Sequence, residues 1–275
     1  MIAFGDPISD ATAIAERLTG RSYLSWSAIS TFLKCPLRYK FHYLDQLPEE
    51  FVSSNLIFGS AIHSALDAYF QEHLAARRSL DLDALLAVYR ESWSEIDLLN
   101  VRFSKTETMT GMSELAERML QAFLDSELSK PEGSIIGIEE EFQAPVIAEC
   151  PDLFARLDLM VEDSTTMTIT DFKTARSRWS PAETNASEGQ LLIYHELVRQ
   201  ITDRPIRLQF AVITKTKTPD IELRTVDPDP QRIARIRRLI QNVWAGIQSG
   251  NYYPVPSAMN CPTCGYRERC LQWNG

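Results

Sequence analysis

The chain has 275 residues, of which 44% are hydrophobic, and its formal net charge is −9. This composition can fill the core of one large domain, and the short apolar runs exclude a membrane-spanning helix. The first ten residues lack the basic and apolar regions of a signal peptide, so we expect a cytoplasmic protein. The acidic balance counts against a nucleic-acid partner, although basic clusters at 176–178, 215–217 and 232–238 are compatible with a local basic groove.

The segment from residue 25 to 130 follows a helical pattern. Residues 25–34 predict a capped helix that ends before Cys35 and Pro36, because proline disfavours helical geometry in the residue preceding it. Three further amphipathic segments predict helices with one buried face, namely 59–74 with Gly59 at its start, 81–99 and 113–128.

The apolar period changes from about 3.6 to 2 near residue 134, which predicts that the chain enters a sheet there. A helix at 188–201 separates the third strand from the fourth, and a helix at 231–250 closes near Gly250. We therefore expect an α/β fold with a small mixed sheet surrounded by helices. The predicted strands are 134–147, 153–162, 166–173 and 206–215.

Acidic residues lie on two of these strands. Strand alternation places Asp171 and Lys173 on one face, and it places Asp158 on the face opposite Leu157 and Leu159. If the strands are neighbours, the two carboxylates converge and repel each other unless a divalent cation that prefers oxygen ligands lies between them. Such an ion would lower the pKa of an attacking water, and the lysine would orient that water. An Asp-x-Lys triplet alone is weak evidence, because composition produces about one per chain of this size.

Five segments together carry a family resemblance. They are SAISTFLKCPLRYKFHYL, FGSAIH ending at His63, RLDLM with Asp158, DFKT with Asp171 and Lys173, and QLLIY with Gln190 and Tyr194. In this order they resemble the PD-(D/E)XK nuclease superfamily and, within it, the RecB-like branch, over residues 25 to 270. The resemblance implies a restriction-endonuclease-like core. The implied organisation is an N-terminal extension at 1–24, a helical segment at 25–130, a nuclease core at 131–250 and an iron–sulfur tail at 251–275 packed with the N-terminal helices.

The resemblance also implies the site. The implied metal ligands for Mg²⁺ or Mn²⁺ are His63, Asp158, Asp171 and the backbone carbonyl of Phe172, with Lys173 as the catalytic lysine. Gln190 and Tyr194 would face DNA or that lysine, and their i, i+4 spacing does place them on one helix face. The acidic residue expected on the first strand is one of Glu139, Glu140 and Glu141, and strand alternation leaves open which of them faces the site.

Four cysteines predict a second site. Cys261, Cys264 and Cys270 lie close together in sequence, and Cys35 is the other cysteine inside a family-like segment. Four thiolates can bind zinc or an iron–sulfur cluster. Resemblance to cluster-bearing RecB-like exonucleases favours [4Fe–4S], with zinc as the alternative. Cys150 has no partner in this arrangement.

The predicted activity is metal-dependent hydrolysis of DNA, and the resemblance implies exonuclease action on single-stranded ends. Two other functions stay open, a non-catalytic cluster-containing DNA-binding module and a zinc-stapled structural or interaction protein. Related proteins act in CRISPR adaptation, recombination and repair, sometimes with helicases. The sequence has no G-x-x-x-x-G-K-[ST] motif, so an ATP-driven motor would come from another chain.

Overall fold

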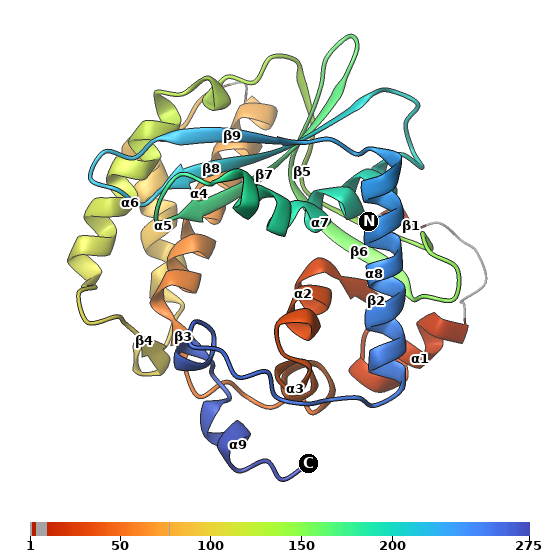
Figure 1. The fold of residues 1–275 in the computed structure, drawn as a ribbon. Coiled ribbons are helices and arrows are strands. Elements are labelled where there is room, and N and C mark those ends of the chain that lie inside the picture. Colours follow the sequence, from red (N-terminus) through yellow and green to blue (C-terminus); the bar gives the residue numbers. More distant parts are fainter. Residues whose placement is uncertain (1, 4–9, 77) are drawn as a thin grey trace.

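The computed structural model describes residues 2–3, 10–76 and 78–275, so most of the first nine residues of the predicted N-terminal extension lie outside the described part. A seven-stranded mixed sheet carries helices on both faces (Figure 1), which confirms the predicted fold class. The strands lie in the order β1, β5, β6, β7, β8, β9, and β2 pairs with the beginning of β6. Their bounds are β1 Ile2–Ala3, β2 Tyr23–Ser25, β5 Ser134–Ala144, β6 Asp152–Glu162, β7 Met167–Ala175, β8 Ile206–Thr214 and β9 Ile221–Val226, while β3 Val52–Ser53 and β4 Val101–Arg102 pair separately.

Each face of the sheet has its own hydrophobic core. One core is formed with α1, α2, α7 and α8, and the other with α4, α5 and α6. Of the described helices, none is long and apolar enough to cross a bilayer. The helices are α1 Asp10–Thr19, α2 Trp26–Lys34, α3 Pro36–Tyr39, α4 Ser54–Ala76, α5 Leu82–Ser94, α6 Met109–Leu124, α7 Pro181–Val198, α8 Pro230–Gln248 and α9 Arg267–Leu271.

Local sequence signals set the ends of α2. The side chain of Ser25 accepts a hydrogen bond from the backbone N–H of Ala28, as expected of an N-cap. At the other end Cys35 is extended and Pro36 begins α3, which confirms the predicted stop. The first residue of α2, Trp26, lies directly over Gly189 of α7, where a Cβ would overlap the indole ring. The two helices therefore pack ring against backbone.

The helix that carries His63 begins earlier than predicted. It starts at Ser54 rather than Gly59, because buried Ile57 and Phe58 extend its apolar face by one turn. Ser54 is itself buried and donates a 2.7 Å hydrogen bond to Glu107 Oε2. Gly59 instead allows a close approach to β7, since a Cβ there would lie 3.4 Å from Thr174 Oγ1.

Several elements were missing from the sequence prediction, among them β1, β2, β9 and α1. Strands β1 and β2 are too short to show a period, and β9 is an edge strand whose alternation is interrupted by charged residues. Helix α1 buries only small residues and threonines, so its apolar face is weak in the sequence. The four long predicted strands and the helices at 188–201 and 231–250 are present with shifted ends.

The alternation predicted around Asp158 is wrong in one respect. Leu157 packs in the core that includes α7, whereas Leu159 packs in the core that includes α4, so the two leucines do not share a face. On the neighbouring strand β5, Glu140 pairs with Leu157 and Ile138 pairs with Leu159. Glu139, between these two partners, has a left-handed φ of 51°. A local irregularity of this kind redirects side chains, as at a β-bulge.

Candidate metal and catalytic site

The site lies where two neighbouring strands separate. Strands β6 and β7 pair only between residues 159–162 and 167–170. Beyond this point the carboxylate of Asp158 occupies the gap and accepts a 2.7 Å hydrogen bond from the backbone N–H of Phe172. Asp158 is thereby fixed to both strands, and its second carboxylate oxygen is left for another partner.

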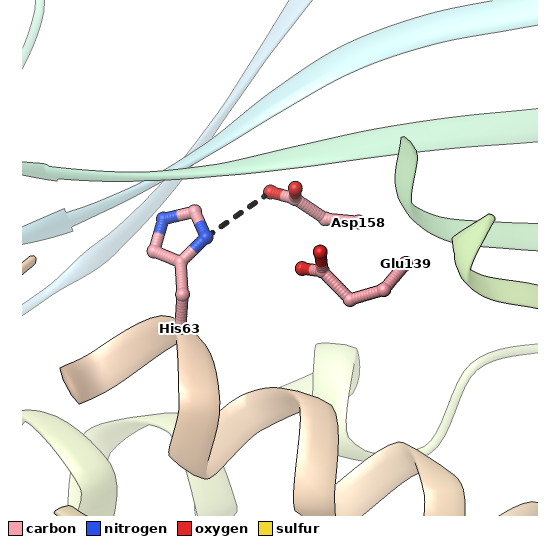
Figure 2. Close-up of side chains that lie close together, drawn as sticks. All are labelled: His63, Glu139 and Asp158. Carbon is pink, nitrogen blue, oxygen red and sulfur yellow. Dashed lines mark ion pairs between the residues drawn. The ribbon is translucent and has the colours of Figure 1, made fainter. Parts of the chain in front are cut away.

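Three possible metal ligands converge at Asp158 (Figure 2). His63 comes from α4, Glu139 from β5 and Asp158 from β6, and one ligand atom of each lies within 4.8 Å of the others. His63 Nδ1 is 3.5 Å from Asp158 Oδ2. Glu139 is therefore the member of the three consecutive glutamates that the structure brings to this group.

The electrostatics of the three side chains suit a divalent cation. Burial raises the pKa of Asp158 well above its usual range, and the nearby carboxylate of Asp171 adds to this rise. Burial also raises the pKa of Glu139, with a further contribution from Asp67. Burial lowers the pKa of His63, which favours the neutral imidazole that binds metals. A divalent cation would relieve the repulsion between the carboxylates.

Asp171 is held from two directions. Its Oδ2 forms an ion pair with the Lys173 ammonium, as strand alternation predicted. Its Oδ1 accepts hydrogen bonds from Gln190 Nε2 at 2.8 Å and from the Tyr194 hydroxyl at 3.1 Å. Gln190 also donates to the Tyr194 hydroxyl at 2.6 Å. The face of α7 that carries Gln190 and Tyr194 is thus turned to Asp171, which is only 1% exposed.

All of these side chains open onto one cavity of about 720 Å³. Sequence reasoning did not select two further residues there, Asp67 and Arg156. Asp67 lies four residues after His63 on α4, and this i, i+4 spacing was a usable signal. Arg156 lies two residues before Asp158 on β6, so alternation alone could have found it. Glu139, one of the three candidate glutamates, also lines the cavity. The predicted residues there are His63, Asp158, Asp171, Lys173, Gln190 and Tyr194.

The four predicted cysteine ligands line a different cavity, of about 300 Å³. Cys35 caps α2, while the other three lie in the tail that follows α8 and passes below α2 and α3 (Figure 1). Burial raises the pKa of Cys270, and the three other thiols raise it further. Tyr266 packs with Leu37 and Phe41 behind the cysteines. Cys150 is instead buried in the core that includes α7, and it does not line this cavity.

Comparisons with known proteins bear on the fold and the family of the chain. A crystal structure of a Eubacterium rectale protein provisionally named an exonuclease is similar with a TM-score of 0.59 at 16% identity, over 96% of this chain and 92% of that one. The structure of SSO0001 gives a TM-score of 0.38 at 13% identity, over 89% and 94% of the two chains, which is too low to support an argument. No curated protein is similar enough in sequence to count as a match. The sequence model of the PD-(D/E)XK nuclease superfamily matches residues 23–271, and the chain belongs to this superfamily.

Proposed function

We propose that the chain is a Mg²⁺- or Mn²⁺-dependent deoxyribonuclease that acts as an exonuclease on single-stranded DNA ends. The observation that carries this proposal is the convergence of His63, Glu139 and Asp158 beside the Asp171–Lys173 ion pair in one open cavity. Crowded carboxylates next to a lysine are the donor set that metal-assisted phosphodiester hydrolysis requires. The superfamily match and the exonuclease description of a structural neighbour support the same reaction class.

Each residue has a role in this proposal. The metal would neutralise charge on the phosphate and supply a water of lowered pKa. Lys173 would orient the attacking water, and its ammonium is held in place by Asp171. Gln190 and Tyr194 position Asp171 through its other oxygen. The proposed ligands are His63, Asp158, Asp171, the Phe172 carbonyl and, from the observed geometry, Glu139.

The test is cleavage of end-labelled single-stranded DNA with Mn²⁺ by anaerobically purified protein. We expect EDTA and Asp171→Ala each to abolish cleavage, while Asp203→Ala, at an exposed aspartate, leaves it unchanged. Duplex and circular substrates run in parallel report strand and end preference. Binding without cleavage would overturn the catalytic proposal in favour of a DNA-binding module, and cleavage by Asp171→Ala would overturn the site.

We also propose that Cys35, Cys261, Cys264 and Cys270 bind a [4Fe–4S] cluster. The donor set fits, because four thiols line one partly apolar cavity. The same four thiols could hold a tetrahedral zinc ion. The resemblance of the Cys35 segment and the C-terminal cysteine trio to cluster-bearing RecB-like exonucleases favours the cluster.

Metal analysis distinguishes a [4Fe–4S] cluster from zinc at the cysteine site. We expect brown protein with visible absorbance and close to four irons per chain after anaerobic purification, and loss of both in Cys264→Ser. One zinc per chain in colourless protein would establish the zinc-stapled alternative. The proposed partner is a helicase that acts in recombination, repair or CRISPR adaptation.

A further inference from the structure

The face of β6 that carries Asp158 continues away from the metal site. Along this strand Leu153, Ala155 and Leu157 are buried in the core that includes α7. The alternate side chains, Phe154 and Arg156, therefore point to the same side as Asp158. Phe154 is half-buried and Arg156 is exposed, so this side of the strand is not filled by the core.

An aromatic platform lies at the far end of this row. Strand β2 pairs in parallel with the beginning of β6, with Ser25 opposite Phe154. This pairing places the ring of Tyr23 on that of Phe154, with centroids 4.5 Å apart and an interplanar angle of 26°. Both rings are half-buried. Two stacked rings that stay partly exposed can extend the stack to a nucleobase.

Arg156 lies between the platform and the metal site and lines the catalytic cavity. Its Nε and Nη2 both donate to Glu141 Oε1, at 3.2 and 2.7 Å. Among the described residues Nη1 has no hydrogen-bond partner, and the side chain is 57% exposed. Glu139 Oε2 lies 3.8 Å from Nε, so the guanidinium also borders the proposed metal ligands. An arginine held on one edge and open on another can bind a phosphate.

From this arrangement we propose that the Phe154–Arg156–Asp158 face of β6, with Tyr23, is a binding track for single-stranded nucleic acid leading to the metal site. This inference rests on the proposed nuclease function and adds its substrate subsite. A base stacks on the Tyr23–Phe154 pair, Arg156 binds a backbone phosphate, and the scissile phosphate lies at Asp158. Alternate side chains on a strand are about 6.7 Å apart, so the platform is about 13 Å from the metal site, a few nucleotides away.

The chemistry of the track favours single strands. Bases in a duplex are already stacked and paired, so an aromatic platform beside one strand would have to displace them. A single strand offers an open base face and a flexible backbone, and stacking on aromatic rings tolerates any base. The acidic charge of the whole chain is no obstacle, because the phosphate contact is local and is made by one arginine.

The experiment measures dissociation constants for a fluorescent single-stranded oligonucleotide in EDTA, where cleavage is blocked, over a series of salt concentrations. Phe154→Leu keeps an apolar side chain and removes the ring, and we expect it to weaken binding about fivefold or more. Its salt dependence should stay that of the unmodified protein. Phe103→Leu, at another half-buried phenylalanine, which packs against the core that includes α4, is the matched control and should bind normally.

Arg156→Gln should give the complementary result. Loss of one phosphate contact to a single strand reduces the slope of log K against log salt by about 0.7. Arg207→Gln, at an exposed arginine on β8, should leave the slope unchanged. An oligonucleotide series with one abasic position should show a single sensitive position in the unmodified protein, and Phe154→Leu should abolish that sensitivity.

The outcomes separate this inference from the nuclease proposal. If the unmodified protein cleaves DNA with Mn²⁺ while Phe154→Leu and Arg156→Gln keep its affinity, salt slope and KM, the track is overturned and the nuclease stands. If the protein binds DNA but does not cleave it, the nuclease fails and the variants still decide the track. If it neither binds nor cleaves, both fail.

Discussion

The acidic site and the cysteine site are built in opposite ways. The acidic site uses side chains from α4, β5, β6, β7 and α7, all anchored in the sheet or its covering helices and linked by hydrogen bonds. The cysteine site joins the end of α2 to a short 3-10 helix and to α9 in the tail, around a small apolar cluster. The sheet therefore positions the first site, whereas the second site is held by a few local contacts that the proposed cluster would reinforce.

The largest effect is expected from Cys264→Ser. A cross-link that closes so long a loop stabilises by about 4 to 5 kcal/mol if it behaves like a disulfide, so the melting temperature should fall steeply. Calorimetry under anaerobic conditions measures this fall. The Mn²⁺-induced rise in melting temperature should persist, because the acidic site is held by the sheet.

The control for that change is Cys150→Ala, which removes a thiol outside the cysteine cavity and should cost about 1 kcal/mol. Equal losses in Cys150→Ala and Cys264→Ser would mean that no bound group links the tail to α2. Loss of the Mn²⁺ response in Cys264→Ser would mean that the acidic site is not independent of the cysteine site.

A smaller effect is expected from Gln190→Leu. This change removes one hydrogen bond to Asp171 and leaves the Lys173 ion pair, so cleavage should slow about 10- to 100-fold. Single-turnover kinetics with saturating Mn²⁺ measure the rate, and thermal unfolding should show an intact fold. Gln200→Leu, at an exposed glutamine just beyond α7, is the control and should cut at the normal rate.

The smallest effect concerns pH. Burial raises the pKa of Asp158, so its contribution to apoprotein stability is fully present below the unfolded pKa of about 3.9 and is lost as pH rises through the folded value. In EDTA, Asp158→Asn should therefore melt above the unmodified protein, and the gap should widen with rising pH. The expected scale is about 2 to 4 °C for each kcal/mol of relieved repulsion.

With Mn²⁺ the unmodified protein should instead melt above Asp158→Asn, because metal binding requires the deprotonated carboxylate. The unmodified protein should gain thermal stability from Mn²⁺, increasingly so at higher pH, and Asp158→Asn should gain little. A gap that narrows with rising pH in EDTA would contradict the buried-carboxylate account.

The sequence predicted the positions of site residues correctly where the periodicity of a single helix or strand determines them. The spacing of Gln190 and Tyr194 placed them on one face of α7, and alternation placed Lys173 beside Asp171. Glu139 could not be chosen among the three glutamates. Its own backbone is left-handed, and this sets the direction of its side chain in a way that strand alternation does not predict. The Tyr23–Phe154 stack was equally hidden, since it depends on parallel pairing between strands far apart in the chain.

Helix α2 lies between the two sites and contacts a neighbour of each. Its first residue, Trp26, rests on the backbone of Gly189, the neighbour of Gln190, and its C-cap is Cys35. Nine helical residues form a rod of about 14 Å, and a close-packed rod transmits a displacement instead of absorbing it. A shift of Cys35 would thus reach α7 next to Gln190, while Glu139 and Asp158 stay in place on the sheet. A bulkier residue at position 189 would push against Trp26 and so displace the other end of α2.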